Sequence, residues 1–298
     1  MLTFTFPQYD PLLDALRETL PLEPGRFWID RFSNQELVLN IDDHVEGKDC
    51  LIIGSIAPPD EQLLAMLFLT HTLKKEGAKK ITLLIPYLSY SRQDKDKRGE
   101  SLATALSGKL FESSGVNQVI TVEVHSKMCQ ELFPIPLISI PTYQLFADVI
   151  SSMDFDKVSF VSPDESSIPR IEKILKLAGK KGSVAYLKKI RTREGISHSE
   201  IQGKVSKKVI FMDDILDTGG TLISAVEQIR QKGGEDITIM VTHGLFTGRK
   251  WLKLWQMGVS KIYCTDTTPL PSQLNSSKIV VLSTTPLIAK ELGKLIQK

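Results

Sequence analysis

The sequence lacks several features that would assign it to a secreted, membrane-bound or metal-scaffold protein. Only three cysteines occur, Cys50, Cys129 and Cys264, and they show no metal-ligand spacing, so we expect reduced, buried thiols in a cytoplasmic protein. No run of about 18 apolar residues is present, which predicts that nothing spans a membrane. The first residues carry no basic region followed by a long apolar run, and we expect no signal peptide.

An excess of charge of either sign is also absent. The chain has 37 basic and 35 acidic residues, a formal net charge of +2, which gives no global electrostatic argument for a nucleic-acid partner. Hydrophobic residues make up 42% of the 298 residues and charged residues 24%, an ordinary globular composition. The length favours two domains of ordinary size.

Strand-like and helix-like segments alternate along the chain, which predicts an α/β fold. Each domain should hold a mainly parallel sheet with helices on both faces, and ligands should collect where the strands end. The proline-rich passage 133–141 is the candidate junction, giving domains 1–141 and 142–298, and the last helix could pack back on the first domain. Predicted strands are 37–41, 50–56, 80–86, 118–124, 158–161, 184–187, 237–243, 262–264 and 279–282; predicted helices are 61–75, 102–113, 168–177 and 287–296.

The stretch 209–221, VIFMDDILDTGGT, is the most informative motif. Apolar residues lead into Asp213 and Asp214, then a short segment of one carboxylate, hydroxyls and glycines precedes helical spacing. Glycines let backbone N–H groups point outward, and a helix N-terminus adds partial positive charge, so the segment should cradle a phosphate. The two carboxylates could hold the hydroxyls of an attached sugar. We predict a buried strand with Asp213 and Asp214 at its carboxyl end, then a tight loop and the start of a helix.

Three other segments carry residues suited to phosphate or metal chemistry. Arg92 offers a planar set of donors for phosphate, and Gln93 and Asp94 could bond a base or ribose, although a solvated loop is an equal alternative. His125 ends an apolar strand and, taken alone, is better explained as structural. Asp164 could hold a divalent cation, but a helix cap competes with that role.

The basic segment from Tyr186 to Gly195 leads into a stretch without apolar periodicity. A mobile cationic loop there could close over a transferring phosphoryl group. An exposed surface hairpin is an equal alternative on the residues alone.

Taken in this order, the segments resemble those of the ribose-phosphate diphosphokinase (phosphoribosyl pyrophosphate synthetase) family. The 209–221 stretch is similar to the ribose-phosphate loop that this family shares with type I phosphoribosyltransferases. The segment Arg31 to Glu36, RFSNQE, resembles the loop that packs against the adenine of a neighbouring subunit, and Pro86 to Lys95 resembles the ATP-binding segment. Tyr186 to Arg191, YLKKIR, looks most like the compact archaeal-type branch. The resemblance covers nearly the whole chain.

The resemblance implies two phosphoribosyltransferase-like domains and a role for each matching residue. Lys189 and Arg191 match the catalytic flexible loop, and His125 and Asp164 match positions associated with Mg²⁺. The nucleotide side corresponds to Phe32, Asn34, Gln35, Glu36, Arg92, Gln93 and Asp94. The ribose 5-phosphate side corresponds to Asp213, Asp214, Asp217, Thr218, Gly219, Gly220 and Thr221. The family also implies a homo-oligomer with the active site near a subunit interface.

Three departures from the family pattern stand out. Glu123 replaces the aspartate that many members have before the histidine. Ser166 and Ser167 replace a glycine pair, and their side chains would crowd a ligand that needs the backbone. Residues 1–25 show no clear form of the usual opening strand and glycine-containing turn.

The expected reaction is Mg²⁺-dependent transfer of diphosphate from ATP to the 1-hydroxyl of ribose 5-phosphate, giving phosphoribosyl pyrophosphate and AMP. Positioning and electrostatics should supply most of the catalysis, without a protein nucleophile. Three alternatives stay open: a phosphoribosyltransferase that uses phosphoribosyl pyrophosphate, a non-catalytic regulatory homologue, and a paralogue acting on another phosphorylated sugar.

Overall fold

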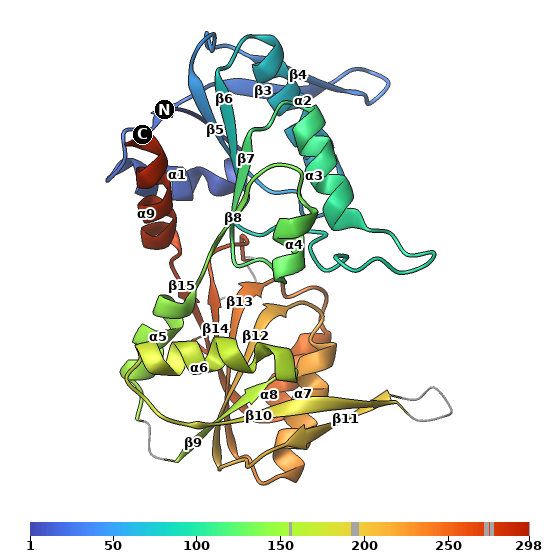
Figure 1. Cartoon of the computed structure of the whole chain (residues 1–298), viewed down its shortest axis with the longest axis vertical. Coiled ribbons are helices and arrows are strands. Elements are labelled where there is room, and N and C mark those ends of the chain that lie inside the picture. Colours follow the sequence, from blue (N-terminus) through green and yellow to red (C-terminus); the bar gives the residue numbers. More distant parts are fainter. Residues whose placement is uncertain (155–156, 192–196, 271–273, 275–276, 298) are drawn as a thin grey trace. The chain divides into compact units, whose positions relative to one another are not determined.

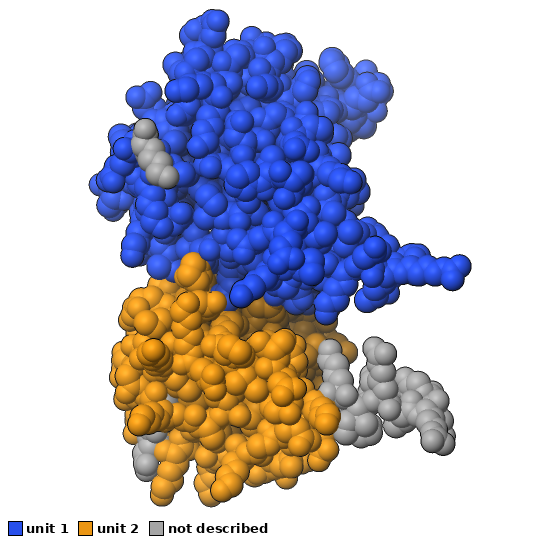
Figure 2. All heavy atoms as spheres, viewed as in Figure 1, with its two compact units in different colours: residues 1–140, 285–298 blue, residues 141–284 orange. Residues whose placement is uncertain are grey.

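The chain folds into two compact units, coloured separately in Figure 2. The computed structural model describes all residues except 155–156, 192–196, 271–273, 275–276 and 298. Unit 1 comprises Met1–Ile140 and Thr285–Lys298, and unit 2 comprises Pro141–Thr284. Unit 2 is therefore inserted in the chain between two parts of unit 1, and the final helix α9 belongs to unit 1.

Unit 1 is built on a six-stranded sheet in the order β2-β1-β5-β6-β7-β8, with parallel pairing throughout (Figure 1). A separate antiparallel pair, β3 and β4, forms a hairpin. The elements are β1 (Leu2–Thr5), η1 (Pro7–Tyr9), α1 (Asp10–Arg17), β2 (Glu23–Pro24), β3 (Phe27–Arg31), β4 (Leu37–Ile41), β5 (Asp49–Ile53), α2 (Glu61–Lys75), β6 (Lys80–Leu84), α3 (Ala103–Ser113), β7 (Gln118–Val122), α4 (Lys127–Leu132), β8 (Leu137–Ile140) and α9 (Thr285–Ile296).

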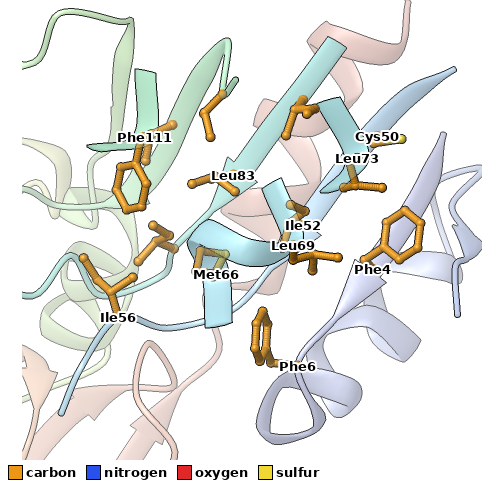
Figure 3. Close-up of a cluster of buried hydrophobic side chains, with 14 of the residues drawn as sticks. Phe4, Phe6, Cys50, Ile52, Ile56, Met66, Leu69, Leu73, Leu83 and Phe111 are labelled. Carbon is orange, nitrogen blue, oxygen red and sulfur yellow. The ribbon is translucent and has the colours of Figure 1, made fainter. Parts of the chain in front are cut away.

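Alternation along the strands of unit 1 produces two hydrophobic cores, one on each face of the sheet. In β5, Cys50 and Ile52 join the core under α2 and α3, which Figure 3 shows with Phe4, Met66 and Leu83. Leu51 and Ile53 point to the opposite face, where α1 and α9 pack. Successive strand residues are all buried because helices cover both faces.

Unit 2 contains a seven-stranded sheet in the order β11-β10-β9-β12-β13-β14-β15. Pairing is parallel except between β10 and β11. One face packs against α7 and α8, and the other packs against α5 and α6. The elements are α5 (Tyr143–Ser151), β9 (Val158–Ser162), η2 (Glu165–Ser167), α6 (Ile168–Leu177), β10 (Ser183–Arg191), β11 (Ser197–Gln202), β12 (Lys208–Leu216), α7 (Gly220–Gln231), β13 (Asp236–Gly244), η3 (Lys250–Leu252), α8 (Lys253–Gln256), β14 (Val259–Thr265) and β15 (Ile279–Leu282).

Strongly periodic segments form the elements that the sequence predicts, whereas several weakly marked strands, among them β1 and β8, were not predicted. Residues 61–75, 168–177 and 279–282 have the predicted bounds. The N-terminal stretch, in contrast, does contain an opening strand: β1 pairs with both β2 and β5. The proline-rich passage 133–141 also contains a strand, β8, which pairs with β7. All three cysteines are buried, as predicted.

None of the helices in the described part of the chain combines the length and the apolar character that a membrane crossing would need.

Candidate active site

The loop after β12 carries the motif that the sequence assigns to a phosphorylated sugar. The predicted strand, loop and helix are present, and β12 continues to Leu216, so Asp213 and Asp214 lie shortly before the end of the strand. Asp213 pairs with Val241 of β13, which shows that the parallel ladder extends past the carboxylates. Residues 217–219 make the turn and α7 begins at Gly220. We call residues 217–221 the phosphate loop.

Gly219 is required by both its backbone conformation and its surroundings. It has φ +84°, the left-handed region that favours glycine, at the N-cap of α7. A Cβ placed on it would lie 2.8 Å from Trp251 Cα and 2.9 Å from Trp251 Cβ. No side chain caps this helix end, and no acidic residue stands in its first turn. The first N–H groups of α7 are therefore available to an anion.

The two carboxylates behind the phosphate loop are electrostatically coupled. Loss of water around Asp213 and the negative charge of Asp214 raise the pKa of Asp213 well above its usual range. The backbone N–H of Asp214 donates to Asp213 Oδ1 over 2.8 Å. The Arg170 guanidinium acts in the opposite direction and lowers this pKa. Arg170 is held in turn by donating from Nη2 to Thr242 Oγ1 over 3.0 Å.

Asp164 lies at the end of β9, which pairs with β12 in the sheet. Its Oδ1 accepts hydrogen bonds from Ser166 Oγ at 2.7 Å, from Ser167 N at 3.0 Å and from Ser167 Oγ at 3.0 Å. Asp164 is therefore the N-cap of η2, the structural role that competed with metal binding. We call residues 163–167 the Asp164 loop.

The basic segment forms an antiparallel arm rather than an extended loop. In β10 and β11, Lys189 pairs with Ser199 and Arg191 with Ser197. The side chains of Lys189 and Arg191 lie outside what the structure describes, as do residues 192–196 between the two strands. The hairpin alternative thus gives the correct local structure for the described strands.

In unit 1, the segment after β6 presents Arg92 and Gln93 on the surface. Asp94 differs from them because only 4% of it is exposed and its Oδ2 accepts from Ser126 Oγ. Cys129 Sγ also donates to the Ser91 carbonyl over 3.3 Å. These two bonds fasten the 91–94 segment to the start of α4. Asp94 thus braces the predicted ATP-binding segment against the residues at the start of α4.

His125 follows β7 and is exposed beside this brace. Glu123, two residues earlier, has φ +41°, an uncommon conformation for a residue with a side chain. The backbone N–H of Glu123 donates to Ile140 O over 2.9 Å, and that of Val124 donates to Ser139 Oγ over 3.1 Å, so the strained turn is held against β8. Strain of this kind concentrates at functional sites.

The hairpin between β3 and β4 carries the remaining nucleotide candidates at its tip. Phe32 is 56% exposed, and Asn34, Gln35 and Glu36 are also exposed. The tip is shaped by Gln35, which has φ +71°, and by Arg31 Nη1 donating to the Gln35 carbonyl over 2.6 Å.

Two contacts at the start of α2 connect this hairpin with the 90–94 segment. Arg31 forms an ion pair with Glu61, while the Tyr90 hydroxyl donates to Asp60. The bond to the Asp60 carboxylate is the main reason that the pKa of Tyr90 rises to about 12. The connection explains how the hairpin and the predicted ATP segment come together at the carboxyl edge of the unit 1 sheet.

The structure thus brings the predicted residues together within each unit. In unit 2, the phosphate loop, the coupled carboxylates and Asp164 share the carboxyl edge of neighbouring strands. In unit 1, Arg92 to Asp94 and His125 share another such edge. Sequence reasoning missed Arg170 and Trp251, since both occur in ordinary amphipathic or apolar contexts that signal only packing. No cluster of three or more His, Cys, Asp or Glu side chains suited to a metal occurs among the described residues.

Comparison with known proteins identifies both ends of the chain with one family. Residues 1–115 match the model of the N-terminal domain of ribose phosphate pyrophosphokinase. Residues 187–298 match the phosphoribosyl synthetase-associated domain.

Curated relatives and a solved structure extend the match to nearly full length. The ribose-phosphate pyrophosphokinase of Campylobacter jejuni is 32% identical over 279 residues, which cover 93% of this chain and 89% of that protein. The Bacillus caldolyticus protein of the same name is 29% identical over 290 residues, with 96% and 91% covered. The crystal structure of phosphoribosylpyrophosphate synthetase from Mycobacterium smegmatis superposes with a TM-score of 0.90 at 28% identity, covering 99% of this chain and 98% of that one.

The superposition confirms the predicted fold of two phosphoribosyltransferase-like α/β domains. With a relative above 30% identity aligned over most of both chains, the inference from the phosphate loop and the N-terminal segments is also confirmed at the level of the family. The chain is an enzyme that belongs to the ribose-phosphate pyrophosphokinase family.

Proposed function

We propose that the chain transfers the diphosphoryl group of ATP to the 1-hydroxyl of ribose 5-phosphate, giving phosphoribosyl pyrophosphate and AMP. The hydroxyl oxygen attacks the β-phosphorus, and the bond from that phosphorus to the oxygen bridging the α- and β-phosphates breaks. The observation that carries the proposal is the phosphate loop: it joins the two adjacent carboxylates near the end of β12 to the uncapped N-terminus of α7. A phosphorylated sugar matches both halves of that arrangement.

The sugar phosphate is assigned to unit 2. Its phosphate accepts N–H and hydroxyl donors from the phosphate loop, that is, from Asp217, Thr218, Gly219, Gly220 and Thr221. Asp213 and Asp214 accept hydrogen bonds from the ribose hydroxyls. Each such bond favours an ionised carboxylate and so offsets the loss of water that raises the pKa of Asp213.

The transferring phosphates are assigned to cationic groups. Lys189 and Arg191, on β10, neutralise charge that develops in the transition state, and Arg92 neutralises charge on the ATP side. We also propose Mg²⁺ as the cofactor, with Asp164 as a candidate contact in unit 2 and His125 as a candidate contact in unit 1. Bound Mg²⁺ would supply charge neutralisation for the phosphate oxygens.

The donor set fits a cation that is held largely by its substrate. Mg²⁺ bound to nucleotides usually takes one or two carboxylates and completes its shell with phosphate oxygens and water. Asp164 is exposed, and its Oδ2 has no hydrogen bond among the described residues, whereas Oδ1 accepts three. One carboxylate oxygen is thus open without rearrangement of the cap.

The adenine side is assigned to the β3–β4 hairpin, with Phe32, Asn34, Gln35 and Glu36 contacting the nucleotide beside Gln93 and Asp94. Because the exposed Phe32 needs a covering surface, we propose a homo-oligomer whose active site lies near a subunit interface. Trp28, Leu64 and Phe68 are large exposed apolar residues on β3 and α2, and they support this proposal. Sedimentation of the purified chain tests it, and a monomer at every concentration would contradict it.

Two finer assignments complete the proposal. The Tyr186 to Arg191 pattern supports the compact archaeal-type branch, and three buried free cysteines support a cytoplasmic location.

The decisive experiment measures AMP released from ATP and Mg²⁺, with and without ribose 5-phosphate. The proposal predicts AMP only when the sugar phosphate is present, together with an equal amount of phosphoribosyl pyrophosphate. AMP formation that ignores the sugar would contradict it. A parallel assay with phosphoribosyl pyrophosphate and a nucleobase, without ATP, detects a phosphoribosyltransferase instead.

A further inference from the structure

Trp251 fixes the chain segment after β13 against the phosphate loop. Its ring packs edge-to-face on Phe246 at 4.9 Å between centroids, and its Nε1 donates to the Gly248 carbonyl over 3.1 Å. Its backbone is so close to Gly219 that a Cβ on that glycine would lie 2.8 Å from Trp251 Cα. The residue before Trp251, Lys250, is consequently presented to the loop by well-packed neighbours.

The ammonium group of Lys250 lies beside Gly220, which is in the phosphate loop and at the start of α7. A Cβ on Gly220, the first residue of α7, would be 3.7 Å from Lys250 Nζ and 4.0 Å from Thr218 Oγ1. The cation, the loop hydroxyl and the first turn of the helix therefore border one small volume. Lys250 is the first residue of η3, and it lies outside every motif that the sequence reasoning singled out.

The electrostatics of this position favour an anion. A helix N-terminus carries partial positive charge, so a lysine beside it is the unfavourable arrangement. The first turn of α7 contains no acidic residue that could compensate. No carboxylate forms an ion pair with Lys250 in the part of the chain that the structure describes. A bound phosphate would be attracted both to the Lys250 ammonium group and to the N-terminus of α7.

We propose that Lys250 is a substrate-binding residue whose ammonium group contacts the 5-phosphate of the sugar held by the phosphate loop. The inference rests on the proposed function and adds to it a cation for the phosphomonoester. That phosphate does not react, so the contact strengthens binding of the ground state and the transition state equally. Its loss should raise the Kd and KM for ribose 5-phosphate and leave kcat unchanged.

The test compares Lys250→Gln and Lys250→Arg with the matched control Arg249→Gln, all in the full chain. Titration calorimetry with ribose 5-phosphate, without ATP, gives Kd at low and at physiological salt. Loss of a charge-assisted hydrogen bond predicts a Kd roughly tenfold weaker for Lys250→Gln. The salt dependence of Kd should also fall, because one ionic contact is gone. Lys250→Arg should retain most of the affinity, and Arg249→Gln all of it.

The outcomes separate this inference from the proposed function. An unchanged Kd and salt dependence in Lys250→Gln would overturn the role of Lys250, even if the unmodified chain makes AMP in a sugar-dependent way. An unmodified chain that binds ribose 5-phosphate through Lys250 but releases no AMP would support this inference and contradict the reaction. An unmodified chain that does not bind the sugar phosphate would overturn both. Equal thermal unfolding temperatures for the variants establish that folding is intact.

Discussion

The phosphate loop and the Asp164 loop follow neighbouring parallel strands of one sheet. They differ in whether a side chain caps the helix that comes next. After β12, Gly219 takes a left-handed conformation and leaves the first N–H groups of α7 without a side-chain cap. After β9, Asp164 fills that role itself by accepting from Ser166 and Ser167. One loop is open to a ligand, whereas the other already satisfies its own donors. The comparison separates a helix N-terminus whose first N–H groups stay open from a helix start where a carboxylate already accepts hydrogen bonds.

The largest expected effect comes from β10, the strand next to β9. Changing Lys189 on this strand tests whether the two loops are sufficient for catalysis. Lys189→Ala should lower kcat by two to three orders of magnitude, about 3–4 kcal/mol, because a cation that stabilises the transferring group is removed. Binding of ribose 5-phosphate should be retained, as measured by calorimetry. The neighbouring exposed lysine gives the control, Lys188→Ala, which should turn over normally. Unchanged kcat in Lys189→Ala would remove this residue from the mechanism.

The next largest effect is expected at Gly219, whose left-handed backbone shapes the phosphate loop. Gly219→Ala should lower the free energy of unfolding by about 2–4 kcal/mol, since the added Cβ is strained at φ +84° and collides with Trp251. Gly220→Ala meets only ordinary contacts, the nearest at 3.7 Å, and should change stability by less than about 1 kcal/mol. Chemical denaturation measures both. Equal losses in the two variants would contradict the assignment of special strain to Gly219.

A smaller effect is expected when the Asp164 loop is made to resemble the phosphate loop. The double change Ser166→Gly and Ser167→Gly removes two hydroxyl donors from Asp164 and should lower stability by about 1 kcal/mol. Because only the bond from the residue 167 backbone N–H then remains on Asp164 Oδ1, the carboxylate is less restrained, and half-maximal activity should need several-fold less Mg²⁺.

The matched double change Ser166→Ala and Ser167→Ala removes the same donors without adding backbone freedom. It should shift the Mg²⁺ dependence in the same direction with a smaller loss of stability. A Mg²⁺ requirement that stays the same in both double variants would show that the hydroxyls do not restrain Asp164.

The smallest effect concerns the carboxylate behind the phosphate loop and depends on pH. Folding raises the pKa of Asp213 above 3.8, so the folded chain binds the proton more tightly than the unfolded chain. Stability should therefore fall as pH rises from about 4 through the raised value. Asp213→Asn removes this cost, and its unfolding temperature at neutral pH should exceed that of the unmodified chain by a few degrees.

Thermal unfolding recorded from pH 4 to pH 8 checks the sign. The gap between Asp213→Asn and the unmodified chain should widen with pH, while the variant binds ribose 5-phosphate more weakly. A gap that narrows with rising pH would mean that Asp213 is stabilised as an ion in the absence of ligand.

The sequence predicts best where one regular pattern dominates. The helices 61–75 and 168–177 and the strand 279–282 have their expected bounds because apolar spacing is unbroken there. The strand that carries Asp213 and Asp214 was also predicted, but the sequence does not show that it continues past them to Leu216. In this chain the ladder to β13 continues through them and holds them in place.

Other features of the site depend on partners far away in the sequence and leave no local pattern. The short strand β1 becomes clear only through its pairing with β5, and β8 lies in a passage whose prolines suggest a linker. The sequence predicts Asp94 as a nucleotide contact, but it does not show that Asp94 also accepts a hydrogen bond from Ser126, 32 positions away in the chain. Motif resemblance supplied the family and the phosphate loop. Only the three-dimensional structure shows which carboxylates already accept hydrogen bonds from the protein.

The return of α9 to unit 1 has a consequence for the order in which the nascent chain can mature. Ile288 and Leu292 complete the core on one face of the unit 1 sheet, against strands that end by Ile140. On the ribosome, the whole of unit 2 is translated between those strands and that helix. Unit 2 can therefore close its own cores first, while α1 alone of the two helices covers the face that carries Leu51 and Ile53. A chaperone that binds exposed apolar surface would therefore bind unit 1, at the face of the sheet that α9 later covers.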